Sequence, residues 1–367
     1  MGNDRIHEID ILKGIGILSV VCGHSFGFVI PVIQIHSLWL INTYQIFVFL
    51  FTSGGTYRPG QSYKTDMGKR IVSLAAYNFL YNLLFVLMHN GLIRMGVLDA
   101  VRYRKADLLE KIINGVQLDT AESMLGAFWF IPMLLFAMVF FIGFWRFAEA
   151  RKHKLFWHIL CIVGSIGIGY GIRHYALFDR VGHHMMISFL GVPVIYAGKL
   201  FFSYKEKSEK ALTWYGMLAA LVIIVLSIKQ KQQIALSVYV VPDPLWFYGI
   251  TICGIYGCLY VTKWIVKSAL LTKWMSVVGK NSLHIMALHF LSFKAVDLLL
   301  IGCGLFDAHR YPLNGYPTSG LPIGFAYVLA GTLLPLGAIT VVKLLKKWCQ
   351  ALNWKRISGI QCAPGAD

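Results

Sequence analysis

Ten apolar segments follow one another along this chain of 367 residues. Crossing about 30 Å of bilayer hydrocarbon takes roughly 20 residues of α-helix, and each segment comes near that length. Inside a bilayer the backbone must satisfy its own hydrogen bonds, which favours continuous helices. The sequence therefore predicts an all-α, polytopic transmembrane helix bundle that forms a single domain over residues 1–367. The expected spans are 9–30, 37–54, 71–90, 126–147, 155–172, 183–203, 211–228, 245–267, 282–305 and 321–344.

Two of these segments depart from a simple apolar span. Pro193 and Gly191 interrupt the sixth, because proline removes a backbone N–H and glycine weakens a helix. Lys294 and Asp297 place charge within the ninth, where ionisable groups are costly.

Composition and charge fit a membrane setting. The chain is 57% hydrophobic and only 14% charged, whereas about 25% of an ordinary soluble domain is charged. The net charge of +17 comes from basic residues in short runs between the apolar segments, a pattern typical of cytoplasmic loops. All these runs fall on one side if both termini are cytoplasmic, so we expect that topology. The sequence has no nucleic-acid-binding motif, and its first apolar segment does not resemble a cleavable signal peptide.

Lys13 and His24 lie eleven residues apart in the first apolar segment. Eleven residues is close to three helical turns, so both side chains are expected on one face, roughly 16 Å apart along the axis. Ionisable groups at membrane depth by default face a cavity. Asp10 precedes Lys13 by three residues and can pair with it. In the alternative interpretation, Lys13 only snorkels to the membrane surface and His24 is a structural hydrogen-bond donor.

Further polar residues follow the next two apolar segments. Asn78, Asn82 and His89 share one helix face because they are spaced by four and seven residues. Ser53 precedes two glycines at the end of the second segment. Each of these residues alone is typical of hydrogen bonding between helices. Together with His24 they predict that the first three segments surround a hydrated cavity.

A second polar group opens the ninth segment, with Lys280, Asn281 and Ser282. Asn281 or Ser282 can cap that helix. Lys280 could bind a phosphate, or it could simply follow the positive-inside rule. His284 and His289 are five residues apart, about 140° round the helix, and so cannot both face one metal ion. We expect no metal site.

Trp129 belongs to an aromatic stretch at the start of the fourth segment, which is typical of an interfacial belt and could also wall a site mouth. The sequence has no P-loop, no Gly-x-Ser-x-Gly and no His-Glu-x-x-His motif. Asp297 is the only acid well within a span, so chemistry centred on histidine is favoured over a proton-coupled pump. The seven cysteines include no Cys-x-x-Cys pair, and we expect neither a structural disulfide nor a cysteine metal site.

These motifs resemble acyltransferase family 3, the bacterial ten-helix membrane O-acyltransferases, over nearly the full length of the chain. The most specific part is Asp10-Ile11-Leu12-Lys13-Gly14 followed by His24. The family usually has arginine in the place of Lys13, and the fucose 4-O-acetylase-like branch often has lysine. The weaker matches are Phe47–Gly55 to a Phe-Phe-x-x-Ser-Gly stretch, Phe128–Ile131 to a Trp-Phe-Leu-like motif, and Gly279–Ser282 with His289 to a late Gly-x-x-Ser…His segment.

The resemblance implies an inner-membrane enzyme that moves an acyl group, commonly acetyl, from cytoplasmic acetyl-CoA to a hydroxyl of an extracytoplasmic cell-envelope glycan. It implies that His24 is the catalytic base or a transient acyl carrier, and that Lys13 and Asp10 belong to the catalytic residues with it. The residues expected to bind the phosphates of the coenzyme are Lys13, Arg58, Lys69, Arg70 and Lys280. The residues expected to contact the substrate or a developing oxyanion are Ser53, Asn78, Asn82, His89, Trp129, Asn281, Ser282 and His289.

Other functions remain open from the residues alone. A transporter or exporter of a small polar or glycan substrate would use the same cavity, but it predicts broken helices in matched repeats. Pro193 is taken as such a break, and we find no matched partner segment for it. A structural partner in a polysaccharide synthase complex is a third possibility. Residues 91–125 and 306–320 lie on the acceptor side in the expected topology and are candidates for setting specificity. No Gly-x-x-x-Gly motif clearly demands a dimer, so a homo-oligomer stays open.

Overall fold

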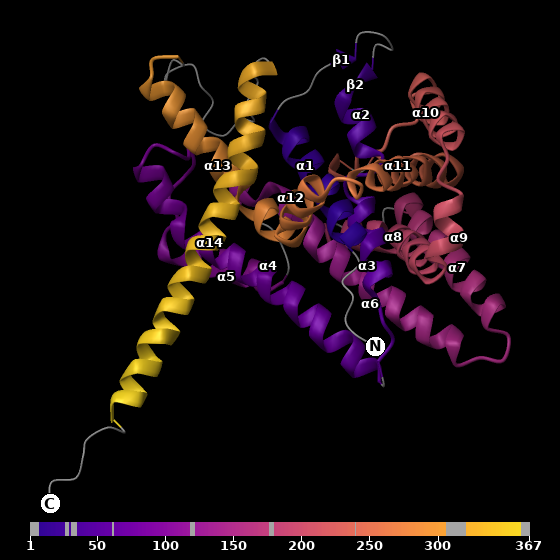
Figure 1. Cartoon of the computed structure of the whole chain (residues 1–367), viewed down its shortest axis with the longest axis horizontal. Coiled ribbons are helices and arrows are strands. Elements are labelled where there is room, and N and C mark those ends of the chain that lie inside the picture. The colour runs from indigo at the N-terminus through magenta and orange to yellow at the C-terminus, as the bar shows by residue number, and fades with distance from the viewer. Residues whose placement is uncertain are drawn as a thin grey trace, which may run out of the picture.

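The computed structural model describes residues 7–25, 29–30, 35–60, 62–117, 122–175, 180–238, 240–305 and 321–360. The described part is a helical bundle with one pair of two-residue antiparallel strands, β1 (Val29–Ile30) and β2 (Ile35–His36) (Figure 1). Its α-helices are α1 (His7–Ser25), α2 (Ser37–Asn42), α3 (Phe47–Thr56), α4 (Tyr63–Arg94), α5 (Lys105–Val116), α6 (Phe130–Glu149), α7 (Lys154–Tyr175), α8 (Arg180–Ser203), α9 (Lys205–Lys210), α10 (Trp214–Lys229), α11 (Pro244–Ile265), α12 (Ala269–Lys280), α13 (Ser282–Gly302) and α14 (Leu321–Ile360). Two 3-10 helices, η1 (Ser123–Trp129) and η2 (Leu236–Val238), join them.

Within the described residues, seven helices are long and apolar enough to cross a membrane. They are α4, η1 with α6, α7, α8, α11, α13 and α14, and all of them coincide with expected spans. The other three expected spans are helical too, but α1 carries three charged residues, α10 has only 16 residues, and the second span is divided into α2 and α3. The chain is therefore a multi-pass helical membrane protein, and the count of ten crossings stays a prediction.

The expected span 37–54 is not one continuous helix. A turn over residues 43–46 separates α2 from α3. The Thr43 hydroxyl donates to the Leu40 carbonyl, and the Gln45 amide donates to Asn42 Oδ1 at 2.6 Å. Gly254 of α11 packs so closely on Thr43 that a β-carbon there would lie 2.6 Å from its hydroxyl oxygen. The break therefore depends on local side-chain hydrogen bonds and on a neighbouring helix.

The expected span 9–30 also ends early. Helix α1 stops at Ser25, whose hydroxyl donates to the Cys22 carbonyl, and β1 follows after a gap in the described residues. A side chain that hydrogen-bonds to the preceding turn favours such a helix end. His24 thus lies in the last turn of α1.

The two segments with unusual residues both form unbroken helices. Pro193 lies inside α8, and the Tyr248 hydroxyl donates to the neighbouring Leu190 carbonyl at 3.0 Å. The missing N–H of Pro193 would have bonded the Phe189 carbonyl, so the Tyr248 contact joins α11 to α8 beside the proline without replacing the lost bond. Lys294 and Asp297 pair within α13, with Nζ and Oδ2 3.1 Å apart, so the two charges partly compensate each other where they are buried.

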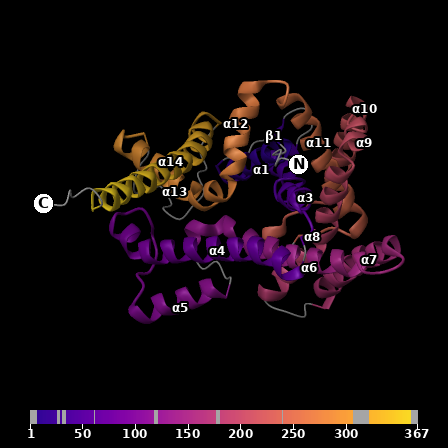
Figure 2. The same ribbon diagram turned by 60° about the horizontal axis from the view of Figure 1, so that its bottom comes forward.

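Besides the six-residue α9, the short helices α5 and α12 lie outside the expected spans, and these two share a pattern. Each combines basic residues with exposed apolar ones, including Leu109 and Ile113 in α5 and Leu270 and Trp274 in α12. This pattern is typical of helices that lie in the membrane interface. Figure 2 shows α5 beside α4.

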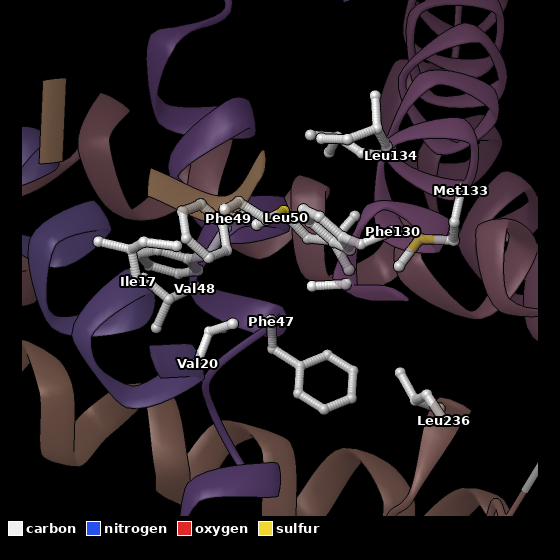
Figure 3. Close-up of a cluster of buried hydrophobic side chains, with 14 of the residues drawn as sticks. Ile17, Val20, Phe47, Val48, Phe49, Leu50, Phe130, Met133, Leu134 and Leu236 are labelled. Carbon is white, nitrogen blue, oxygen red and sulfur yellow. The ribbon is translucent and has the colours of Figure 1, made fainter. Parts of the chain in front are cut away.

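Helix α1 lies inside the bundle and packs against α3, α11, α12, α13 and α14. Its crossing with α12 is very close: a β-carbon on Gly279 would overlap the Asp10 backbone carbonyl. Only glycine permits this approach, and it brings Lys280 beside Asp10. A cluster of buried apolar side chains continues from α1 through α3 to α6 (Figure 3). By contrast, the second half of α14 extends beyond the other helices in Figure 1.

Candidate active site

Two cavities lie beside α1, one at each end. The Lys13 cavity has a volume of about 410 Å³ and includes Lys13 in its lining. The His24 cavity has a volume of about 200 Å³ and includes His24. The two residues are eleven positions apart on one helix, which corresponds to a rise of about 16 Å. One helix therefore supplies an ionisable side chain to each cavity.

The Lys13 cavity is the polar and charged one. The Asp10 carboxylate is buried, and its Oδ2 lies 4.0 Å from Nζ of the partly exposed Lys280. With two lysines and one acid, the charged groups of this lining are net positive, which suits an anionic ligand. Its ionisable and hydroxyl-bearing residues are Asp10, Lys13, Ser53, Thr56, Ser73, Lys280 and Ser282.

The His24 cavity has a lining without Asp, Glu, Lys or Arg among the described residues. His24 is its one ionisable side chain among the described residues, and Trp129 supplies an aromatic wall. The side chains of Asn42 and Gln45, joined by their hydrogen bond, contribute amide groups at the turn between α2 and α3. The turn that divides the expected span 37–54 therefore also helps to form this cavity.

His24 lies against the second half of the bundle. Its ring centroid is 5.4 Å from that of His289 in α13, and the Phe290 ring packs edge-on at 4.9 Å. His289 is fully buried. His24 lines the His24 cavity, whereas His289 lines neither cavity and packs behind the His24 ring.

The hydrogen bonds of His289 fix its tautomer. Its Nδ1 lies 2.8 Å from the carbonyl oxygen of Met286 and 3.2 Å from that of Ile285. A carbonyl can only accept, so Nδ1 carries the proton in the neutral ring. Nε2 then has a lone pair, and it is buried without a hydrogen-bond partner among the described groups. His289 therefore presents a fixed acceptor close to His24.

The other candidates on α4 lie elsewhere and line neither cavity. His89 Nδ1 lies 3.0 Å from Glu122 Oε2, and its ring stacks on Tyr103 with centroids 3.6 Å apart. Asn82 donates to the Asn78 carbonyl, and the Asn78 side-chain amide is buried without a partner in the described residues.

Among the remaining candidates, Ser53 and Ser282 line the Lys13 cavity and Trp129 lines the His24 cavity. Asn281 precedes α13 but does not cap it, because its amide donates backward to the Val277 carbonyl. Arg58 donates to the Gly55 carbonyl at 3.3 Å. The side chains of Lys69 and Arg70, and residues 306–320, lie outside the described part of the chain.

Sequence reasoning did not single out Phe130 and Met286, which line both cavities. Phe130 lies in the aromatic stretch Phe128–Ile131 that resembles a family motif, whereas Met286 has the same pattern as ordinary core and gave no sequence signal. Sequence reasoning also missed Asp66, which holds the loop after α3. The Arg146 guanidinium lies 2.7 Å from Asp66 Oδ2, and the Tyr57 hydroxyl donates to the same oxygen.

The described residues contain no cluster of three or more His, Cys, Asp or Glu side chains that could hold a metal ion. The two imidazoles by themselves do not provide the three or more ligands of a typical zinc site. The chemistry that this arrangement supports is proton transfer or nucleophilic attack by a histidine in a small, uncharged cavity next to one whose charged groups are net positive.

The comparisons with known proteins agree with this arrangement. The chain matches acyltransferase family 3, described as an acyltransferase domain, over residues 6–340. No curated protein and no solved structure matches the chain. Because the match covers most of the chain and includes α1, α6 and α13, the protein belongs to acyltransferase family 3 and is a membrane enzyme that transfers acyl groups.

Proposed function

We propose that this enzyme transfers an acetyl group from cytoplasmic acetyl-CoA to a hydroxyl of an extracytoplasmic cell-envelope glycan. The observation that carries the proposal is that α1 supplies Lys13 to a charged cavity and His24 to a neutral cavity next to it. An acyl-CoA has the matching form, with anionic phosphates at one end and a neutral thioester at the end of a long arm.

The coenzyme end binds at the Lys13 cavity in this proposal. Lys13 and Lys280 attract the phosphates, and Asp10 keeps the Lys280 ammonium at the rim. Arg58 is a further candidate for the phosphates, and Lys69 and Arg70, whose side chains lie outside the described part, stay candidates from the sequence alone. This cavity faces the cytoplasm if both termini are cytoplasmic, as the basic loops favour.

Transfer takes place at His24. In the direct route, a hydroxyl oxygen of the acceptor attacks the thioester carbon while its proton passes to the His24 imidazole. The C–S bond then breaks, and the coenzyme thiolate takes that proton. In the alternative route, an imidazole nitrogen forms an acyl–histidine first, the thiol leaves, and the acceptor hydroxyl then attacks this intermediate.

His289 positions His24 in either route. The lone pair on its Nε2 can accept a hydrogen bond from an N–H of His24, which would hold the ring in one tautomer and stabilise the imidazolium that forms. Trp129 and Gln45 line the same small cavity, and the acceptor would bind against them. Ser53 and Ser282 line the Lys13 cavity, where they would contact the arm of the coenzyme.

Binding and transfer measured together test this proposal. Calorimetry with acetyl-CoA on the purified protein in detergent should show binding that Lys13→Ala weakens and His24→Ala retains. Labelled acetyl reaching the envelope glycan in cells should fall about 10²- to 10⁴-fold in His24→Ala, the usual contribution of a general base.

His158→Ala is the matched control, because His158 hydrogen-bonds to Tyr196 and Glu149 and lines neither cavity. It should keep both binding and transfer. A folded wild type that does not bind acetyl-CoA would contradict the proposed donor. Normal turnover by His24→Ala would contradict the proposed role of His24.

A further inference from the structure

The Lys13 cavity and the His24 cavity have a wall in common. Of the described residues, only Phe130 and Met286 line both. Phe130 is the first residue of α6, Met286 lies in the second turn of α13, and both are buried. They stand between the place where Lys13 meets an anion and the place where His24 meets a thioester.

The two halves of this wall differ in stiffness. The Phe130 ring packs against Phe49 of α3, with centroids 5.6 Å apart, in the apolar cluster of Figure 3. An aromatic ring held this way has little freedom. Met286 is unbranched, with three rotatable bonds, and adapts readily to a changing neighbour. Its carbonyl accepts the His289 hydrogen bond, so its backbone is fixed while its side chain can move.

Passage between the cavities therefore depends on the Met286 side chain. In the proposed function, the acyl group is the leading end of the coenzyme arm and reaches this wall first. An acetyl group adds only a methyl group to the carbonyl carbon, whereas each further methylene needs more room. A difference of one methylene in an apolar site commonly changes a rate 10- to 200-fold.

We propose that Phe130 and Met286 form a partition that selects the acyl group by size, with Met286 setting the limit. This inference rests on the proposed function, because it takes the acyl-CoA arm as the molecule that passes. It assigns specificity for the donor to two residues with no polar atoms in their side chains.

The test compares transfer from acetyl-CoA and butyryl-CoA to envelope glycan in membrane vesicles. Wild type should favour acetyl-CoA. Met286→Ala should reduce the acetyl-to-butyryl ratio of kcat/KM at least about tenfold, mainly by raising the butyryl rate. Met286→Val should shift the ratio in the same direction by a smaller factor. It replaces the alanine variant in this test if Met286→Ala does not fold.

Met133→Ala is the matched control. Met133 is a fully buried methionine on α6, one turn beyond Phe130, and it lines neither cavity (Figure 3). Its truncation removes the same atoms from the core but should leave the ratio unchanged. A ratio that shifts equally in Met133→Ala and Met286→Ala would mean general loosening of the core, and would overturn the inference.

A larger side chain tests the same wall from the opposite direction. Met286→Trp should block transfer from both donors while binding of free coenzyme A, measured by calorimetry, stays within about threefold of wild type. Unchanged ratios in every Met286 variant that still turns over would overturn the partition and leave the proposed function standing. A folded wild type that binds neither acyl-CoA would overturn both.

Discussion

Helix α13 holds two buried polar groups about 12 Å apart along its axis, and their surroundings differ. Asp297 is paired on both oxygens: Lys294 lies 3.1 Å from Oδ2, and the Tyr327 hydroxyl of α14 donates to Oδ1. His289 donates through Nδ1, but its Nε2 has no partner among the described groups, and the centroid of its ring is 5.4 Å from that of His24. The first group holds α13 to α14, whereas the second leaves an acceptor free for chemistry.

The contrast between Asp297 and His289 separates a buried polar group that packing accounts for from one that it does not. A charge at membrane depth is conspicuous in a sequence and often indicates a site. Here the charged pair has partners that account for it, and the less conspicuous histidine has an atom that packing leaves unsatisfied. Other buried atoms of the described part, such as both amide atoms of Asn78, also have no hydrogen-bond partner, so it is the contact with His24 that makes His289 a candidate.

Removing the paired acid should have the largest effect on stability. Asp297→Ala leaves the Lys294 ammonium buried without its carboxylate, which typically costs about 3–5 kcal/mol. The double change Lys294→Met with Asp297→Leu should recover most of this loss, because it removes both charges together. Thermal unfolding in detergent measures both variants. Full stability with lost transfer in Asp297→Ala would instead place this pair in the active site.

Changing His289 should affect the rate more than the stability. His289→Phe keeps a ring of similar shape but removes the acceptor beside His24. Loss of a hydrogen bond to a charged group costs about 1.5–3 kcal/mol, so kcat should fall roughly 10- to 150-fold while acetyl-CoA binding is kept. His289→Gln, which offers an oxygen acceptor, should restore part of the rate. If both variants lose stability and rate to the same extent, His289 is structural like Asp297.

Breaking a partly exposed ion pair should have the smallest effect on stability. Lys205 lies 2.6 Å from Glu8, and both side chains are partly exposed. Lys205→Met should therefore cost at most about 1 kcal/mol of unfolding free energy and leave transfer unchanged.

The stability that Lys205→Met loses should depend on pH. Burial lowers the pKa of Lys205, but the hydrogen bond and the charge of Glu8 raise it by more, so the net shift is upward. A lysine with a raised folded pKa adds stability below its unfolded pKa of about 10.4 and loses it as pH rises through the folded value. The difference in Tm between wild type and Lys205→Met should be constant near neutral pH and shrink above about pH 10. A difference that instead grows at alkaline pH would contradict this pairing.

Much of the fold could be predicted from the sequence. Each apolar segment contains a helix, although the structure departs from the expected spans at the turn over residues 43–46 and at β1, because length and hydropathy alone decide which segments suit a bilayer. The break between α2 and α3 could not be predicted, since residues 43–46 contain neither proline nor glycine and the turn depends on a helix far along the chain. The amphipathic helices α5 and α12 were missed because their apolar faces are too short to appear as spans.

The sequence by itself determined that this protein is a multi-pass membrane helix bundle of acyltransferase family 3, because apolar length and a motif such as Lys13 with His24 are local properties of the chain. Only the tertiary structure decided which polar residues meet. It separated His89, paired with Glu122, from His289, which faces His24, and it made Phe130 and Met286 the wall between two cavities. These are contacts between helices distant in sequence, and helical periodicity fixes the faces of each helix but not its neighbours.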